Sequence, residues 1–121
     1  MAKRYYRQLR DIYTNYQHRG LEILAFPCNQ FFKQEAWSEE RILTHVRGMG
    51  VAFPIFAKCN VNGPNASNLY RFLRAHSELK GRRVQWNFCK FLIDREGNIV
   101  KFFGTSIEPE RTRRAIESLL C

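Results

Sequence analysis

Apolar residues recur at helical spacing at the start of the chain. They fall three or four positions apart, at Tyr6, Leu9, Ile12, Tyr13 and Tyr16. Because an α-helix has 3.6 residues per turn, this spacing places all of them on one helical face. Gly20 follows, and glycine readily adopts the left-handed backbone that ends many helices. We predict an amphipathic helix over residues 3–19.

Further helices are predicted from the same periodicity and from the residues that precede them. Ser38 is a typical N-cap, and Glu39 and Glu40 in the first turn complement the helix dipole. Ser67 can cap the next helix in the same way. The apolar faces comprise Ile42, Leu43 and Val46, then Leu69, Tyr70, Phe72 and Leu73, and finally Ala115, Ile116, Leu119 and Leu120.

Short apolar runs between these helices predict strands. Residues 21–26 are apolar enough for a buried strand, which Pro27 ends, and residues 52–56 form a brief extended piece. Residues 88–93 and 98–103 flank a polar turn, which indicates a β-hairpin. The order is helix, strand, two helices, hairpin and helix. We therefore expect an α/β protein that forms a single domain over residues 1–121.

Composition narrows the class of protein. The chain is 45% apolar, as in globular domains, and no apolar run reaches the roughly 20 residues of a membrane span. The basic, aromatic start is unlike a secretory signal. Its four cysteines show no C-x-x-C spacing and no paired histidines, so we expect no metal site. Reduced thiols favour an intracellular, cytoplasmic setting.

The net charge of +9 comes mainly from residues 1–19 and 71–90, and in the second stretch Lys80, Arg82 and Arg83 precede Trp86. Such a field favours anionic partners, namely lipid headgroups, glutathione carboxylates or nucleic acid. A basic surface that only maintains solubility accounts for the charge equally well. No DNA- or RNA-binding motif accompanies the charge, so we expect no specific nucleic-acid partner.

Neutral polar groups gather where the predicted strands meet loops. Cys28, Asn29 and Gln34 follow the first strand, and Trp86 and Asn87 precede the hairpin. Strand ends are where catalytic groups collect in α/β sheets. A thiol, amides and an indole N–H suit a site that stabilises a polarisable or anionic atom through neutral donors.

Several phrases resemble the glutathione peroxidase family. They are Leu24-Ala-Phe-Pro-Cys-Asn-Gln-Phe31, Lys33-Gln-Glu35, Phe53-Pro-Ile-Phe56, Asn60-Val-Asn-Gly63, Trp86-Asn-Phe88 and Lys90-Phe-Leu-Ile-Asp94. The resemblance covers nearly the whole chain. It implies a thioredoxin-like fold and reduction of peroxides by a cysteine or selenocysteine.

The resemblance assigns Gln34, Trp86 and Asn87 as the donors around that nucleophile. Gln34 has unusual surroundings, because Phe32 stands where the family usually has glycine. Cys28 is not the attacking group in the family, and a partly buried thiol is usually a packing residue. Cys89 is likewise expected to be a packing residue.

The resemblance also implies that the family's first, central strand and its nucleophile lie upstream of Met1. We therefore expect a thioredoxin-like fold that lacks this strand, and a targeting peptide could be lost with it. The strand would lie between residues 21–26 and 88–93. Its absence would leave unpaired backbone groups, so the fold would be marginal unless the halves close up or another chain supplies a strand.

Substrates and partners follow from finer features of the resemblance. Val46 stands where thioredoxin-dependent members carry a second cysteine, which favours glutathione or another external thiol as co-substrate, with no bound cofactor. A short connection before Trp86 resembles the monomeric, phospholipid-hydroperoxide type. With Lys80, Arg82 and Arg83, it suggests an anionic membrane surface as a partner. The alternative is an inactive thioredoxin-like remnant that binds an acidic partner through its basic face.

Overall fold

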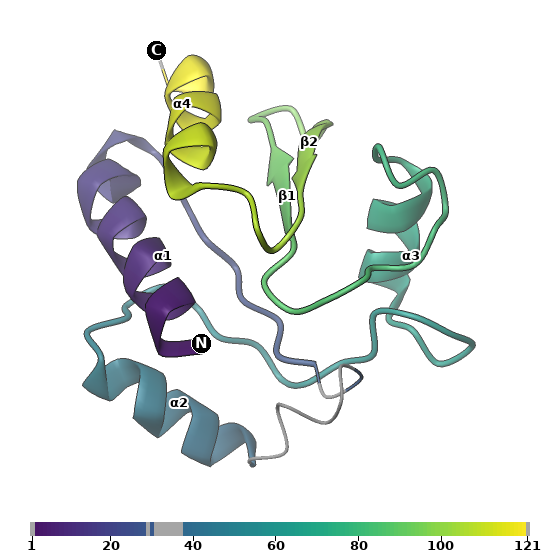
Figure 1. The fold of residues 1–121 in the computed structure, drawn as a ribbon, viewed down its shortest axis with the longest axis horizontal. Helices are drawn as coiled ribbons and strands as arrows, with labels where there is room; N and C mark the ends of the chain where they lie inside the picture. Colours follow the sequence, from purple (N-terminus) through teal and green to yellow (C-terminus); the bar gives the residue numbers. More distant parts are fainter. Residues whose placement is uncertain (1, 29, 31–37, 121) are drawn as a thin grey trace.

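The computed structural model describes residues 2–28, 30 and 38–120. Its elements are α1 (Ala2–Tyr16), the 3-10 helix η1 (Gln17–Arg19), α2 (Glu39–Gly48), α3 (Asn68–Ala75), β1 (Lys90–Ile93), β2 (Ile99–Phe103) and α4 (Pro109–Leu119). In Figure 1, α1 and α4 lie on one side of the β1–β2 hairpin and α3 on the other. Within the described residues, no helix is both long and apolar enough to cross a bilayer.

The helix ends form where the sequence predicts them. Gly20 has φ 112° and donates its N–H to the Gln17 carbonyl at 3.1 Å, which ends η1. The Ser38 hydroxyl accepts the Arg41 N–H, and the Ser67 hydroxyl accepts the Tyr70 N–H, both at 3.2 Å. Each serine satisfies a backbone donor that has no partner inside its own helix.

The hairpin is confirmed, but its first strand is shorter than expected. β1 and β2 pair antiparallel, and the Asp94 carboxylate accepts the Glu96 and Asn98 N–H groups in the turn. The strand begins at Lys90 and not at residue 88, because Phe88 has φ 60°. This left-handed backbone conformation cannot continue a strand ladder.

The buried strand expected over residues 21–26 is only partly correct. Ala25 makes an isolated parallel bridge to Ile55: its N–H donates to Pro54 at 3.0 Å, and its carbonyl accepts the Phe56 N–H at 2.8 Å. On the other side no described strand pairs with the segment. Leu24 therefore stays 54% exposed, since no neighbouring strand covers it.

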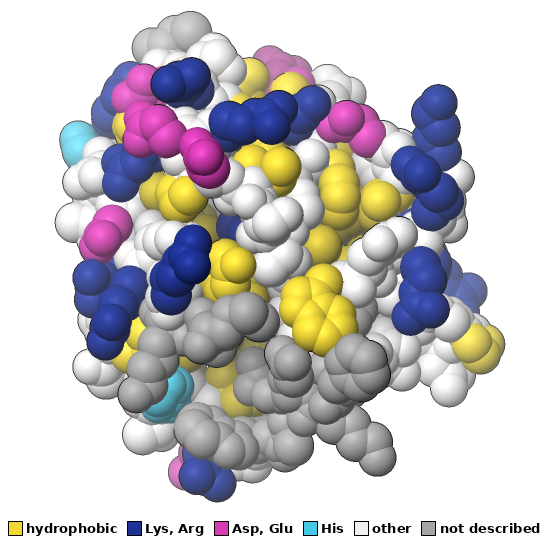
Figure 2. Space-filling view, viewed as in Figure 1, with side chains coloured by type: hydrophobic (Ala, Val, Ile, Leu, Met, Phe, Trp, Pro, Cys, Tyr) yellow, Lys and Arg dark blue, Asp and Glu magenta, His cyan; other side chains and the backbone are white. Residues whose placement is uncertain are grey.

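A cavity of about 570 Å³ separates residues 21–28 from β1. We call it the sheet groove. Leu24 and Phe26 line one wall, while Phe91 and Ile93 line the other. Figure 2 shows apolar side chains exposed at the centre of this face. The groove occupies the place between residues 21–26 and β1 where the sequence predicts that a strand is lacking.

The core is divided into separate clusters. One packs Tyr6 and Tyr13 of α1 against Val46, Val51 and Phe53, and the Tyr13 and Phe53 rings meet edge to face at 5.6 Å. A second packs Ile12 and Tyr16 against Ile116 of α4. The third contains Cys28, Val61, Leu79 and Val84 beside the sheet groove. A divided core makes each cluster important for stability.

Phe53 tests this dependence, because its side chain is fully buried. Phe53→Ala should lower the free energy of unfolding by about 3–5 kcal/mol, since it removes apolar contacts and leaves a cavity. Phe72→Ala is the matched control, because Phe72 is 49% exposed on α3. Urea titration followed by circular dichroism measures both. Equal losses for the two variants would contradict the assignment of Phe53 to the core.

Candidate active site

Trp86 and Asn87 lie in the turn that leads into β1, and both line the sheet groove. Two hydrogen bonds hold this turn. The Thr105 hydroxyl donates to the Asn87 carbonyl, and the Lys90 Nζ donates to the Phe88 carbonyl at 2.6 Å. These bonds support the left-handed backbone at Phe88. The turn therefore places an indole and an amide, both neutral hydrogen-bonding groups, at the wall of an apolar groove.

Cys28 and Trp86 belong to the same apolar cluster. The structure therefore brings the end of the 21–28 segment close to the turn that carries Trp86 and Asn87. The Cys28 thiol is buried and donates to the Gln30 Oε1 at 3.4 Å. That oxygen also accepts the N–H groups of Val61 and Asn62, at 2.8 and 3.0 Å. The side-chain oxygen of Gln30 thus holds the loop around Asn62 in place.

Asn62 extends this network to the segment that precedes Trp86. Its buried amide bonds both backbone groups of Val84: Oδ1 accepts the Val84 N–H at 2.8 Å, and Nδ2 donates to the Val84 carbonyl at 2.7 Å. Gln30 and Asn62 were not among the predicted site residues. Both lie within phrases that carry the family resemblance, so the signal was present in the sequence.

The described cysteines are free thiols in apolar surroundings. Burial raises the pKa of the Cys59 thiol, so its nucleophilic thiolate form is disfavoured. The Cys28 thiol donates to the Gln30 side-chain oxygen, which is a neutral acceptor. The Cys89 sulfur lies 3.8 Å from the Thr105 hydroxyl. Of the three, Cys89 has a cation nearby, because it interacts electrostatically with the Lys90 ammonium.

Lys90 lies three residues after Asn87, and it also lines the groove. Burial lowers the pKa of its ammonium group, because desolvation disfavours the charged form. The Nζ atom lies 5.9 Å from the centre of the Tyr5 ring. A carboxylate placed beside it would favour the ammonium form.

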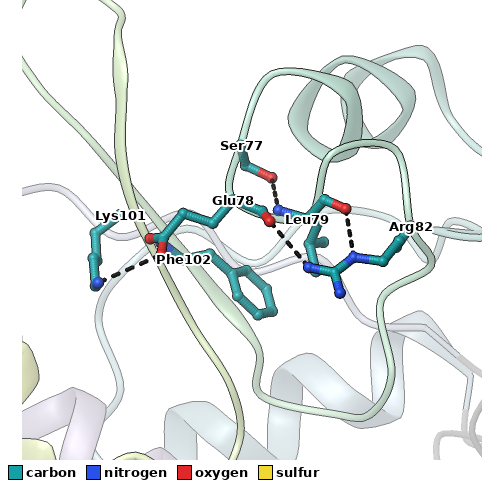
Figure 3. A network of polar contacts seen from close by, with 6 residues as sticks. All are labelled: Ser77, Glu78, Leu79, Arg82, Lys101 and Phe102. Carbon is teal, nitrogen blue, oxygen red and sulfur yellow. Dashed lines mark hydrogen bonds and ion pairs between the residues drawn. The ribbon is translucent and has the colours of Figure 1, made fainter.

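Of the other predicted site residues, Gln34 lies outside the described part of the chain. Lys80, Arg82 and Arg83, which we call the basic loop, follow α3 and do not line the groove. Arg82 folds back on its own loop, as Figure 3 shows. Its Nε donates to the Leu79 carbonyl at 2.9 Å and one Nη donates to the Glu78 carbonyl at 3.2 Å.

The neighbouring acid is also engaged. Glu78 accepts the Phe102 N–H at 3.0 Å and lies 3.5 Å from the Lys101 ammonium (Figure 3). The Phe102 N–H lowers the pKa of the Glu78 carboxyl, with a smaller contribution from Lys101. Glu78 therefore does not neutralise the basic loop, because it covers the outer edge of β2 instead. Lys80 and Arg83 remain exposed.

Comparison with known proteins shows which family this chain resembles in sequence and in structure. The model for glutathione peroxidase matches residues 1–74. A glutathione peroxidase-like peroxiredoxin of Schizosaccharomyces pombe is 42% identical, covering 95% of this chain and 74% of its own. A Nicotiana sylvestris protein named "Probable phospholipid hydroperoxide glutathione peroxidase" is 44% identical, covering 95% and 69%. The crystal structure of Trgpx in its apo form superposes with a TM-score of 0.74 at 32% identity, covering 95% and 69%.

These findings confirm the expected thioredoxin-like α/β fold. The chain belongs to the glutathione peroxidase family, a class of oxidoreductases. The resemblance inferred from its sequence phrases is therefore correct.

The Asn62 network can be tested by deletion of its amide. Asn62→Ala leaves the buried N–H and carbonyl of Val84 without their partner, so we expect a loss of roughly 1–3 kcal/mol in unfolding free energy. The exposed Asn65 in the same loop provides the control, and Asn65→Ala should stay within about 0.5 kcal/mol of wild type. Chemical denaturation measures both. A neutral Asn62→Ala variant would show that the two segments are held by packing alone.

Proposed function

We propose that this chain carries the hydrogen-bond donors of a thiol-dependent hydroperoxide reductase. In this reaction a thiolate or selenolate attacks the terminal peroxide oxygen. The O–O bond breaks, and the alkoxide leaves as an alcohol after it gains a proton. Two reducing thiols then convert the oxidised nucleophile back to its starting form, releasing water and a disulfide. Membership of the glutathione peroxidase family supports this reaction class.

The observation that carries the proposal is the shared position of Trp86 and Asn87 at the apolar groove. Neutral N–H donors stabilise an anion strongly where water is scarce, because the low dielectric strengthens each interaction. The hydrogen bond from Thr105 to the Asn87 carbonyl supports the turn that carries them. Gln34 is proposed as a third donor from its place in the family phrase.

The reacting group is a residue other than Cys28 or Cys59. Burial disfavours the thiolate of Cys59, and Cys28 donates its thiol proton to Gln30. We propose that a cysteine or selenocysteine outside the 121-residue sequence supplies the nucleophile.

Glutathione is the proposed reductant and lipid hydroperoxides are the proposed substrates. Val46 is buried in the α1–α2 core, where a cysteine side chain would be enclosed by apolar groups. An external thiol is therefore favoured over an internal disulfide. The name of the Nicotiana relative supports a phospholipid hydroperoxide substrate, whereas that of the fission yeast relative leaves the reductant open.

The donor role predicts specific losses of activity. In a version extended at the N-terminus by a strand that ends in cysteine, Trp86→Phe and Asn87→Ala should each slow peroxide reduction about 10- to 1000-fold, as for loss of a preorganised donor. The unextended chain should react no faster than an ordinary exposed thiol, and Cys28→Ser should not change its rate. A coupled glutathione assay with an organic hydroperoxide measures these rates. Wild-type turnover in the Asn87 variant would refute the donor role.

The basic loop predicts attraction to anionic lipid. Figure 2 shows Lys and Arg side chains along the side of the molecule occupied by α3 and the loop after it. Arg82→Glu with Arg83→Glu should reduce co-sedimentation with anionic vesicles, and binding should fall with salt because exposed charges are screened beyond about 8 Å. The matched control is Arg111→Glu with Arg114→Glu, an equal charge change at exposed positions of α4.

Both double variants must retain the circular dichroism spectrum of wild type, since Arg82 also bonds the carbonyls of its own loop. Equal loss in both pairs would mean that net charge alone governs binding. Unchanged binding in the Arg82 and Arg83 pair would favour the alternative in which this surface has no lipid role.

A further inference from the structure

Two of the chain's free thiols lie on segments that run side by side. Ala25 and Ile55 form a parallel bridge between these segments. One residue further along, the rings of Phe26 and Phe56 stack with their centres 4.7 Å apart. Partner residues of paired strands point to the same face, and the Tyr70 ring of α3 packs edge to face against Phe26 at 5.7 Å. The face that carries the two rings is therefore turned towards α3.

An extra residue in the second segment brings the two thiols opposite each other. Regular parallel pairing would give the Pro27 carbonyl the N–H of residue 58. It accepts the Cys59 N–H instead, at 3.0 Å. This shift by one residue is a β-bulge, which re-aims the side chains that follow it. Pairing beyond the bulge makes Cys59 the partner of Cys28, which lies two residues after Phe26 and so on the same face.

The surroundings of the two thiols agree with this register. Cys28 is a member of the apolar cluster beside the sheet groove, and Cys59 packs against that cluster. The segments remain together past this point, because the Gln30 Oε1 accepts the N–H groups of Val61 and Asn62. Paired strands are about 4.8 Å apart, and the Cα atoms of a disulfide are about 4.4–6.8 Å apart. A disulfide between these partners therefore needs no large movement of the backbone.

The two thiols differ in their access to solvent. Cys28 is only 7% exposed, whereas Cys59 is partly buried. Burial raises the pKa of the Cys59 thiol, a hydrogen bond with the Ser67 side chain opposes this rise, and a charge on Cys28 adds to it. A raised pKa leaves little thiolate, but that thiolate is a stronger nucleophile in disulfide exchange. Cys59 is therefore the thiol that an external disulfide reaches first.

We propose that Cys28 and Cys59 form a reversible intramolecular disulfide by exchange with a small external disulfide of the glutathione type. The Cys59 thiolate attacks one sulfur of the external disulfide, whose S–S bond breaks, and the departing thiolate takes up a proton. Cys28 then gives up its proton and attacks the Cys59 sulfur of the mixed disulfide, which releases the second external thiol. The protein loses two hydrogens, and the external disulfide becomes two thiols. This exchange needs no nucleophile outside the chain, so it does not depend on the peroxidase reaction proposed above.

The disulfide would fasten the 21–28 segment to the loop that carries Asn62. Hydrogen bonds of Ala25, Pro27 and Gln30 hold the two together in the reduced chain. A covalent link closes a long loop of the unfolded chain and so lowers the entropy of the unfolded state. The oxidised chain should therefore unfold at a higher urea concentration than the reduced chain. Oxidising conditions would thus stabilise the part of the fold that lies beside the candidate site.

The test incubates the Cys121→Ser chain, which has one thiol fewer, with oxidised glutathione. Alkylation blocks the thiols that remain, and mass spectrometry of proteolytic peptides maps the disulfides. We expect a linked peptide pair containing Cys28 and Cys59, with Cys89 alkylated. In denaturing urea the equilibrium constant for this disulfide should fall about tenfold or more, because only the folded chain holds the partners at bonding distance. A disulfide that contains Cys89, equal formation in urea, or no oxidation at all would overturn the proposal.

Serine variants separate the roles of the two thiols. Cys28→Ser should stop at a mixed disulfide between glutathione and Cys59, whereas Cys59→Ser should leave the buried Cys28 reduced. Cys89→Ser is the matched control, because Cys89 packs against the same cluster, and it should form the disulfide as the parent chain does. Equal glutathione uptake by the Cys28 and Cys59 variants would overturn the order of attack. A urea midpoint that oxidation leaves unchanged or lowers would overturn the stabilising role.

Discussion

The amide of Asn62 holds together the two halves of the site. It satisfies both the N–H and the carbonyl of Val84, while Gln30 fixes the loop on which Asn62 lies. Residues 30, 62 and 84 are far apart in sequence, and Asn62 and Val84 are buried, so that their polar groups have no alternative partner in water. Because an unpaired buried polar group costs more than an ordinary hydrogen bond contributes, these bonds act mainly by excluding other arrangements. They therefore help to fix the turn that carries Trp86 and Asn87 relative to Cys28, which packs in the same apolar cluster as Trp86.

The same cost of unpaired polar groups applies to the backbone groups along the two walls of the sheet groove. The 21–28 segment is paired on one side only, through Ala25, and β1 is paired on one side only, through β2. The outer edge of β2 is covered by the Glu78 carboxylate, which bonds the Phe102 N–H and so removes one free donor from that edge. Among the described residues, no such contact covers the two inner edges. Leu24 and Ile93, which lie along them, are 54% and 46% exposed.

This arrangement has opposite consequences for stability and for chemistry. An apolar cavity at the centre of a small fold reduces the contacts that hold its separate clusters together. The same cavity gives the indole of Trp86 and the amide of Asn87 a setting in which neutral donors can stabilise an anion more strongly than in water. The Cys59 thiol is in the opposite situation, because burial raises its pKa and so disfavours its negative charge.

The sequence by itself determined the local elements and the family. The serine caps, Gly20 and the hairpin turn depend on residues within a few positions of one another, so each could be predicted from its neighbours. The family phrases made Trp86 and Asn87 candidates for the site, and the structure places both at the groove, although Gln34 lies outside the described residues. Tertiary structure decided the rest. Whether residues 21–26 become a buried strand depends on a neighbouring strand, and whether residue 88 extends β1 depends on the Thr105 and Lys90 contacts. The roles of Gln30 and Asn62 arise only when segments distant in sequence meet, since a hydrogen bond across such a distance leaves no periodic pattern in the chain.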